Sequence, residues 1–576
     1  MKKNILKRFF VYIKPYWTYA AIGFLCAIAG IALSLYAPVV SGRAIDKIIG
    51  KGNVNFSGIF GDLLVFLVAM VLSAAFQWGL SFCANKVTYG TIKGLRDDAF
   101  KKLGRLPLRH IDSNPHGDII SRVTNDTDQL SDGLLQFFTQ FFTGSVTILG
   151  TLAFMFSVNY IVAFVVVLLT PLSLFAASFI ARHSFKMFSE QSAIKGELSG
   201  CAEEMIGGLK TVKAFCHEEK AAEKFDGINA RLHKCGIRAQ FYSSLTNPST
   251  RLINGFVYAA TGVAGALLAI NGRMSIGQIS CFLSYAGQYT KPFNEITAVI
   301  TEMQNAFACA ERVFALLDAQ EETDDGGEEI KSCEGRVEFL NVNFGYDAKK
   351  QIIKDFSLSA KPGERVAIVG PTGCGKTTLI NLLMRFYETS SGEIKIDGKD
   401  IKSLSKNNLR RLFGMVLQDT WLFSGTIREN IAYGKEDASF EEIVEAAKKA
   451  HAHGFIKRLE KGYDTVVSDD GGNISQGQRQ LLCIARAMLA MPPMLILDEA
   501  TSSIDTRTEI SVQKAFSEIM RGRTSFVVAH RLSTIKEADT IIVMRSGRIA
   551  EKGTHDELLE KGGFYAKLYK SQFGGE

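Results

Sequence analysis

The chain has 576 residues, of which 47% are hydrophobic and 22% charged, and its formal net charge is +7. This length exceeds what one hydrophobic core normally serves and predicts several domains. The modest charge gives no strong case for nucleic-acid binding, and the basic residues gather beside long apolar runs, as in a membrane protein. The 10 cysteines show no C-x-x-C pair, which favours small buried hydrophobes over a metal site.

The N-terminal stretch MKKNILKRFFVYIKPYW lacks the compact apolar core and the small-residue cleavage site of a signal peptide. Ile5, Phe9, Tyr12 and Ile13 share one helical face, and basic residues occupy other positions. This pattern predicts a short helix lying in the membrane surface.

Six apolar stretches long enough to cross a bilayer follow, because a span needs about 20 residues. They are predicted near residues 19–41, 62–84, 135–158, 160–181, 253–269 and 276–301. The connections 85–134 and 182–251 are long, polar and rich in lysine and arginine, so the positive-inside rule places them and both termini in the cytoplasm. Three basic residues in the first outer loop oppose this assignment but are outnumbered. We expect a multi-pass protein of the cytoplasmic (inner) membrane whose helices extend beyond the bilayer.

Two features of the spans bear on a substrate. The stretch LLQFFTQFFTG has four phenylalanines that either line an aromatic cavity or face lipid and other helices: Phe137, Phe138, Phe141 and Phe142. Lys291 lies inside the last span, where a charge is costly and tends to face a cavity or a partner. Neutralisation by Glu295, four residues on, is the alternative. Pro292 is expected to kink or loosen this helix.

A polar, acidic segment separates the apolar half from a half with the composition of a soluble protein. Its carboxylates repel one another and are expected to bury nothing, so the segment is predicted to be a linker. The expected domains are therefore a transmembrane domain at 1–319, the linker at 320–335 and a soluble domain at 336–576.

The stretch RVAIVGPTGCGKTTLINLL passes from an apolar, β-rich run through a glycine-rich loop into a helical pattern. Such a loop points backbone N–H groups at phosphate oxygens, and the helix N-terminus adds partial positive charge. Lys376 is expected to reach the β- and γ-phosphates, and the Thr377 hydroxyl to bind Mg²⁺. The residues predicted to hold the nucleotide here are Gly370, Pro371, Thr372, Gly373, Cys374, Gly375, Lys376, Thr377 and Thr378.

The stretch PMLILDEATSSID supplies two carboxylates at the end of a predicted buried strand. Asp498 is expected to organise Mg²⁺ and its waters, and Glu499 to polarise the attacking water as a general base. In TSFVVAHRLST another apolar strand leads to His530, which is predicted to contact the γ-phosphate and hold the water. These motifs together predict an ATPase.

With these motifs in place, the chain resembles an ABC transporter half-molecule of the exporter type over essentially its whole length. The resemblance implies a multidomain fold in which a six-helix all-α transmembrane domain precedes an α/β P-loop ATPase domain. It implies that Tyr346 in VNFGYD stacks on adenine and that Gln418 in GMVLQDTWLF senses Mg²⁺ and contacts the membrane domain. HGDIISRVTNDTDQL and EEMIGGLKTVKAF resemble the two cytoplasmic loops that bear coupling helices.

The resemblance further implies that Ser475, Gly477 and Gln478 form the signature motif and that Asp505 is the D-loop aspartate. It implies ATP and Mg²⁺ as cofactors, a second half-transporter as partner, and export of a hydrophobic or amphipathic substrate such as a drug-like molecule, lipid or peptide. An importer on the same fold and a membrane subunit gated by ATP are the alternatives. Intact Glu499 and His530 argue against the gated subunit.

The stretch NISQGQRQLLCIARAML has Gln476 where the signature has the first of two glycines. The replacement puts a side chain near the γ-phosphate held by the opposite domain and restricts the backbone. The preceding VVSDDGGN also departs from the usual pattern. Because the phosphate loop and Glu499 are intact, we expect a heterodimer whose partner completes this chain's catalytic site. A tolerated variant in a homodimer is the alternative.

Overall fold

The computed structural model describes residues 2–50, 53–322, 327–347, 350–417, 420–467, 474–498, 505–529 and 532–573. Its contacts divide the chain into two compact units. The helical unit comprises Met1–Arg105 and Asn114–Ala319, and the sheet unit comprises Leu106–Ser113 and Gln320–Glu576. The sheet unit therefore includes a short piece of the predicted first cytoplasmic loop.

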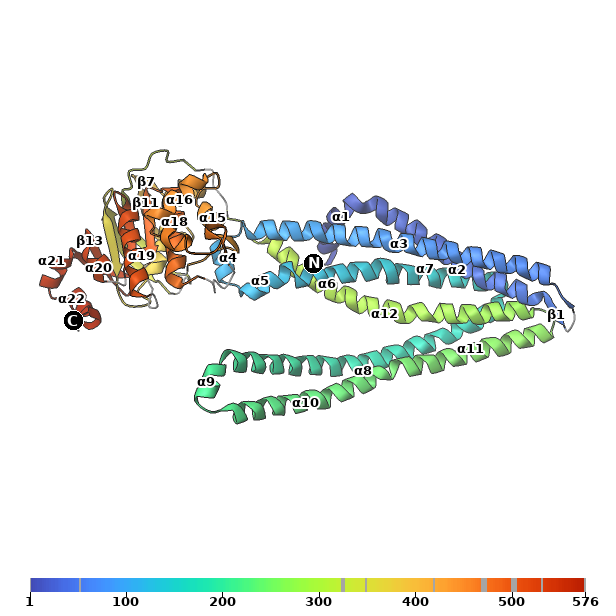
Figure 1. Ribbon diagram of the computed structural model, residues 1–576. Helices are drawn as coiled ribbons and strands as arrows, with labels where there is room; N and C mark the ends of the chain where they lie inside the picture. The colour runs from blue at the N-terminus through green and yellow to red at the C-terminus, as the bar shows by residue number, and fades with distance from the viewer. Residues whose placement is uncertain are drawn as a thin grey trace. The chain divides into compact units, whose positions relative to one another are not determined.

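The helical unit is built almost wholly from long helices (Figure 1). Its elements are α1 (Lys2–Ile13), η1 (Lys14–Tyr16), α2 (Trp17–Asp46), β1 (Ile48–Gly50), β2 (Asn53–Val54), α3 (Phe56–Leu103), α5 (His116–Val123), α6 (Asn125–Gln136), η2 (Phe137–Phe141), α7 (Phe142–Val158), α8 (Tyr160–Gly207), α9 (Leu209–Ala214), α10 (Glu218–Ser244), α11 (Thr246–Ile270) and α12 (Ile276–Asp318). Each of the six predicted spans falls within these helices. In the described part of the chain, four helical stretches are long and apolar enough to cross a membrane: Lys7–Asp46, Phe56–Leu103, His116–Val158 and Glu218–Ile270.

The helices begin where short polar side chains cap them. Asn55 accepts from the Gly58 N–H ahead of α3, Asn159 accepts from Ile161 and Val162 ahead of α8, and Ser275 forms a capping box with Gln278 ahead of α12. At 48 residues each, α3 and α8 are roughly 70 Å long, more than twice the roughly 30 Å of a hydrocarbon core. The helices therefore extend far beyond a bilayer, as expected.

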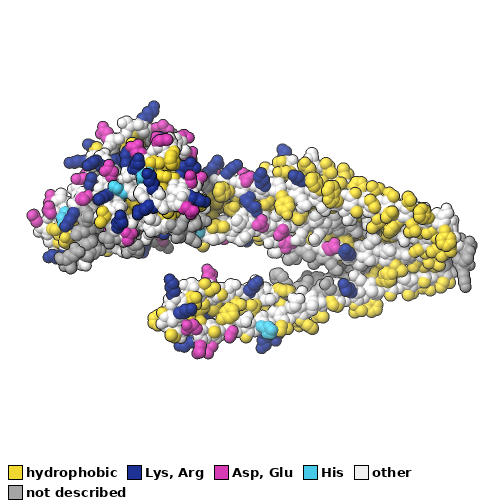
Figure 2. Space-filling model, in the orientation of Figure 1, with side chains coloured by type: hydrophobic (Ala, Val, Ile, Leu, Met, Phe, Trp, Pro, Cys, Tyr) yellow, Lys and Arg dark blue, Asp and Glu magenta, His cyan; other side chains and the backbone are white. Residues whose placement is uncertain are grey.

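The helical unit has a compact bundle and a diverging hairpin. α2, α3, α6, α7 and α12 pack together, whereas α8 and α10 run side by side, joined by α9, away from that bundle (Figure 1). Apolar side chains cover much of the visible surface of the helices (Figure 2). The core includes Leu35, Met155, Phe282 and Tyr285, and the Tyr285 hydroxyl donates to the Leu35 carbonyl at 2.6 Å. Helix α12 continues through Pro292 without ending there.

In its described part the sheet unit has three sheets with helices around them, the smallest being the antiparallel pair of β9 and β10. The six-stranded sheet has the order β14-β13-β5-β12-β11-β8, parallel except for β14, and the antiparallel sheet has the order β4-β3-β6-β7. The strands are β3 (Val337–Phe344), β4 (Ile353–Ala360), β5 (Arg365–Val369), β6 (Ser391–Ile396), β7 (Lys399–Asp400), β8 (Phe413–Val416), β9 (Gly425–Thr426), β10 (Val466–Val467), β11 (Met494–Asp498), β12 (Thr524–Val528), β13 (Thr540–Arg545) and β14 (Arg548–Gly553). Every residue of β11 and β12 is buried, which explains why 494–497 and 526–528 are apolar without alternation.

The helices of this unit flank the sheets and form a separate helical layer. They are α4 (Leu108–Asp112), α13 (Lys376–Leu383), α14 (Lys406–Arg411), α15 (Ile427–Ala432), α16 (Phe440–Lys449), α17 (His453–Ile456), η3 (Gly462–Asp464), α18 (Gln476–Ala490), α19 (Thr506–Met520), α20 (Leu532–Lys536), α21 (His555–Glu560) and α22 (Phe564–Phe573). Helix α18 is buried along most of its length, so it links the helical layer to the sheet.

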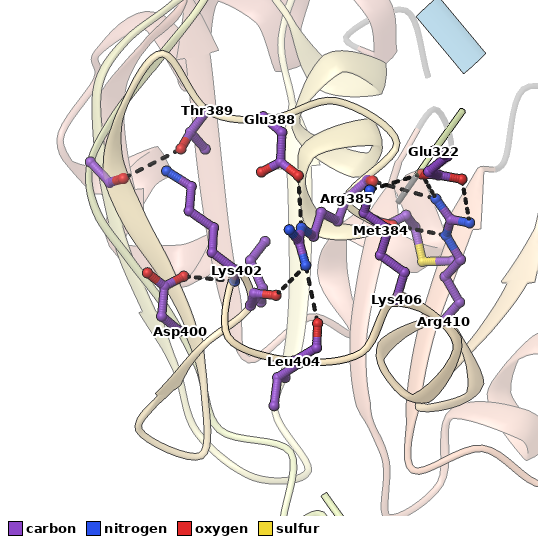
Figure 3. A network of polar contacts seen from close by, with 12 residues as sticks. Glu322, Met384, Arg385, Glu388, Thr389, Asp400, Lys402, Leu404, Lys406 and Arg410 are labelled. Atoms are coloured by element: carbon purple, nitrogen blue, oxygen red, sulfur yellow. Dashed lines mark hydrogen bonds and ion pairs between the residues drawn. The ribbon is translucent and has the colours of Figure 1, made fainter. Parts of the chain in front are cut away.

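The acidic segment is anchored to the sheet unit, contrary to the expectation that it buries nothing. Glu322 accepts two hydrogen bonds from Arg410, at 2.6 and 3.1 Å, and lies 3.5 Å from Lys406 (Figure 3). Glu328 pairs with Lys399 at 2.6 Å, and its backbone bonds to Ser403 and Ser405. Basic residues distant in sequence thus compensate carboxylates that repel one another locally.

Candidate nucleotide and substrate sites

Three neighbouring parallel strands bring the predicted motifs to one edge of the six-stranded sheet. β12 lies between β5 and β11, with Val528 paired to Ile368 on one side and to Asp498 on the other. The carboxyl ends of these strands therefore align, and ligands bind at this edge in open parallel sheets. The glycine-rich loop follows β5 and Asp498 ends β11, so both elements lie at the same edge.

The glycine-rich loop has the backbone of a phosphate cradle. Gly370, Gly373 and Gly375 have φ values of 157°, 79° and 106°, which favour glycine. A Cβ on Gly370 would lie 2.4 Å from the Met544 carbonyl oxygen, whereas one on Gly373 would meet nothing within 4 Å. Gly375 caps α13 without a side-chain hydrogen bond, so the first N–H groups of α13 suit an anionic ligand.

Lys376 is folded into this loop. Its Nζ donates to the carbonyl oxygens of Gly370, at 2.7 Å, and Pro371, at 3.3 Å, and the residue is 9% exposed. None of the carboxylates that the structure describes forms an ion pair with it. A buried ammonium that has only neutral acceptors is incompletely compensated, and a phosphate would supply the missing charge.

Two oxygen ligands fit a hard cation beside the loop. The Thr377 side chain is exposed at the start of α13, whereas Asp498 is 6% exposed at the end of β11. Hydroxyl and carboxylate oxygens are ligands that Mg²⁺ accepts together with phosphate and water. The residues present therefore fit the predicted Mg²⁺ site.

Tyr346 stands beside the loop in a cluster of three rings. Its ring centroid lies 5.1 Å from Phe344 and 4.9 Å from Tyr387, both edge to face. Its hydroxyl donates to the Thr378 hydroxyl at 3.4 Å and accepts from Asn381 at 3.3 Å. These contacts fix the ring next to α13 while the side chain stays partly exposed, as stacking on a base requires.

The same cluster connects to α4, which the sequence did not predict. The Tyr387 hydroxyl donates to the Asp112 carboxylate, and Leu108 packs against the apolar core of the sheet unit. Burial, and then the hydrogen bond to Asp112, raise the pKa of Tyr387 well above its usual range, so the hydroxyl remains a donor at neutral pH. No local motif links residues so far apart in sequence.

The predicted signature forms the start of α18. The Ser475 hydroxyl accepts from the Gln478 N–H at 3.3 Å, and the Gln478 side chain accepts from the Ser475 N–H at 3.1 Å. This capping box is intact despite Gln476, which is the first residue of the helix and partly exposed. Its φ is not in the left-handed region, so the expected backbone restriction does not arise. Gly477 is buried.

Of the predicted site residues outside the phosphate loop that remain, one is described and three are not. Asp505 caps α19 by accepting from the Thr508 N–H at 2.9 Å, and such backbone hydrogen bonds hold its pKa below the usual range. Gln418, Glu499 and His530 lie outside the described residues, as does most of VVSDDGGN. The strands that precede these three residues end at Val416, Asp498 and Val528 in adjacent positions of the same sheet.

The predicted aromatic cavity is a pocket of the helical unit. Phe137 and Phe138 line an apolar pocket of about 420 Å³ with residues of α1, α2, α6 and α12. Phe142 lines a smaller one, of about 60 Å³, together with the same two rings, whereas Phe141 stacks on Phe137 at 5.3 Å. All but Phe142 lie in η2, a π-helix, and such segments are frequent at functional sites.

Lys291 lies at a different, more polar pocket. This pocket, of about 470 Å³, lies between α11 and α12. The Lys291 Nζ is 3.9 Å from the Glu295 carboxylate, at the limit of an ion pair, and 79% of its side chain is exposed. Glu295 therefore neutralises it only weakly.

The fold and the phosphate cradle define a membrane protein with a P-loop ATPase domain. Residues 20–293 match the family model of the ABC transporter transmembrane region, and residues 353–502 match the ABC transporter model. The chain is 44% identical over 536 residues to a fatty acid ABC transporter ATP-binding/permease protein of Mycobacterium bovis, covering 93% of this chain and 84% of that protein. The chain belongs to the ABC transporter family.

Two further matches are to a flippase and to an ABC exporter. The chain is 35% identical over 576 residues to an ATP-dependent lipid A-core flippase of Hahella chejuensis, covering 99% of this chain and 97% of that protein. A solved structure of a bacterial Atm1-family ABC exporter with ATP bound matches with a TM-score of 0.78 and 27% identity, over 97% of this chain and 98% of that one. The chain is therefore a multi-pass, ATP-hydrolysing exporter, and the importer and ATP-gated alternatives are not favoured.

Proposed function

We propose that this exporter hydrolyses ATP at a site built from the phosphate loop, Asp498, Glu499 and His530. The observation that carries the proposal is the alignment of β5, β12 and β11, which brings the cradle and Asp498 to one edge. Lys376 binds the phosphates, Tyr346 stacks on adenine, and Glu499 accepts the proton of the attacking water. Bound Mg²⁺, held by Thr377, Asp498 and Gln418, would neutralise phosphate charge.

The second surface of each site comes from another half-transporter. Ser475, Gly477 and Gln478 would present the N-terminus of α18 to the γ-phosphate held opposite. A partner is supported by the surroundings of α9 in the helical unit. Around it Ile206 and Phe215 are 75% and 71% exposed, and such apolar side chains favour a protein partner. Because Gln476 alters the signature, we favour a heterodimer.

The protein would lie in the cytoplasmic membrane with both termini and the ATPase domain inside. The basic long connections support this orientation. The proposed domains are residues 1–319 in the membrane, 320–335 as an anchored connection and 336–576 for ATP.

The substrate is proposed to be an amphiphile with an acyl chain. The named relatives act on a fatty acid and on lipid A-core, and the pocket beside Phe137 and Phe138 is apolar. An acyl chain suits such walls because burial of methylene groups is favourable.

Transport in inside-out vesicles tests this function. The chain, co-expressed with its partner, should accumulate labelled palmitate in the lumen when ATP and Mg²⁺ are added. EDTA should abolish both accumulation and ATP hydrolysis, and added Mg²⁺ should restore them. ATP-dependent loss of palmitate preloaded in the lumen would instead demonstrate import in the cellular direction.

A further inference from the structure

The polar pocket between α11 and α12 contains a second cation besides Lys291. Arg251 of α11 lines it, and Arg251 forms no ion pair with any residue that the structure describes. The nearby carboxylate of Glu295 offsets at most one of these two charges. One positive charge therefore remains uncompensated at the pocket, and a bound anion would stabilise it.

The pocket walls leave room for a ligand and offer polar contacts. Gly255 and Gly287 line it, and a Cβ on either would meet nothing within 4 Å. The Asn254 side chain also lines it, and its buried Oδ1 has no hydrogen-bond partner among the described residues. An amide can present either its oxygen or its NH₂ group, so Asn254 is able to donate to an anion.

The expected depth of the two cations in the membrane is closer to that of the lipid headgroups than to the bilayer centre. Measured along the helices, Arg251 lies roughly 28 Å from the end of α11 at Ile270, and Lys291 roughly 22 Å from the start of α12 at Ile276. Those ends lie on the outer side in the proposed orientation, and the hydrocarbon core is about 30 Å thick. The cations thus lie in its cytoplasmic half, towards the inner leaflet's headgroups.

We propose that Arg251 and Lys291 bind the monoanionic head of an acyl-chain amphiphile that enters from the cytoplasmic leaflet, with Asn254 as an additional donor. The guanidinium of Arg251 is suited to a bidentate contact with a carboxylate, and Lys291 supplies a point charge. This inference rests on the proposed function and specifies its substrate class as a long-chain carboxylic acid.

Binding and ATPase activation by three ligands test the inference. Palmitate, its neutral methyl ester and phosphatidylglycerol are titrated into the complex in neutral detergent, with binding followed by native mass spectrometry. Palmitate should bind and activate the wild-type complex better than the ester. Arg251→Ala and Lys291→Ala should each weaken palmitate binding by roughly tenfold or more, since each removes a charge-assisted contact. Their affinity for the ester should change by less than about twofold.

Two further variants separate charge from structure. Lys291→Arg should retain most of the preference for palmitate, and Lys195→Ala, which removes an exposed lysine of α8, should bind both ligands like the wild type. Equal loss of palmitate and ester binding in both alanine variants, or preference for the ester in the wild type, would overturn the inference. Dissociation of the two subunits in either alanine variant would also overturn it, by assigning the cations to the subunit interface. Preferential, charge-dependent binding of phosphatidylglycerol would assign the site to membrane lipid. Failure of every ligand to be transported would instead count against the proposed function.

Discussion

Tyr387 and Asp112 are joined by a hydrogen bond that ties α4 to the ring cluster beside the phosphate loop. Tyr387 packs on Tyr346, the proposed adenine-stacking residue, so one side chain contacts both that residue and α4, in the predicted first cytoplasmic loop. Removing only the Tyr387 hydroxyl should abolish the hydrogen bond to Asp112 and keep the ring contact with Tyr346.

Tyr387→Phe should therefore preserve ATP binding and lower substrate-stimulated hydrolysis. The ring contacts remain, but the hydrogen bond to a carboxylate, of about 1.5–3 kcal/mol, is lost. ATP affinity should stay within about twofold of the wild type. Tyr463→Phe is the matched control, because it also loses one hydroxyl contact, with His453 at 2.8 Å, away from α4. Normal stimulation in Tyr387→Phe would show that the bond does not couple the two regions.

Glu499→Gln should bind ATP normally and hydrolyse it at least 100-fold more slowly, because an amide keeps the shape but accepts no proton. Turnover is measured as phosphate release by the complex with its partner present. Glu518→Gln, an exposed position on α19, should hydrolyse ATP like the wild type. Hydrolysis by Glu499→Gln at the wild-type rate would remove Glu499 from the proposed role.

Gln476→Gly should change hydrolysis by the complex little in comparison with Glu499→Gln. In a heterodimer the signature of this chain closes the partner's site, which we expect to lack a functional base. Expressed alone, the chain should hydrolyse ATP weakly, and phosphate release after size-exclusion chromatography measures this. Recovery of a fully active dimer made from this chain alone would contradict the heterodimer.

Glu322→Gln should loosen the anchored acidic segment. Its side chain is only 19% exposed and accepts two hydrogen bonds from Arg410, so the loss should be about 1 kcal/mol. The midpoint temperature of thermal unfolding of the ATPase domain should fall by about 2 °C. Added salt should reduce the difference in midpoint between the variant and the wild type. Glu329→Gln, at an exposed position nearby, should have no effect. An equal fall in both variants would mean that the Arg410 contact contributes nothing specific.

Features encoded by local spacing were predicted from the sequence, and contacts between distant segments were not. The strand before Gly370 and the helix after it each depend on a short run of residues, and the structure has them where expected. The six predicted spans all lie in helices, although spans 160–181 and 276–301 fall outside the four described stretches that are apolar enough to cross a membrane. Glu322 was read as part of a repelling run because its partner Arg410 is distant in sequence. The bond between Tyr387 and Asp112 was missed for the same reason.

At Gln476 the sequence predicted a restriction of the backbone that the structure does not have. A glycine at this position of the motif suggests a backbone conformation that only glycine adopts easily. The first residue of a helix instead has ordinary helical dihedral angles, which glutamine also adopts. Any cost of Gln476 thus falls on the proposed contact with a second subunit rather than on the fold of this chain.

Helix α3 runs for 48 residues without a proline and ends shortly before α4 in the chain. Such a rod converts a small change of angle into a large displacement. Over roughly 70 Å, a tilt of about 5° moves the far end by about 6 Å, close to the pitch of one helical turn. A change of a few degrees in the direction of α3 at one end would therefore displace its other end by about the length of one helical turn.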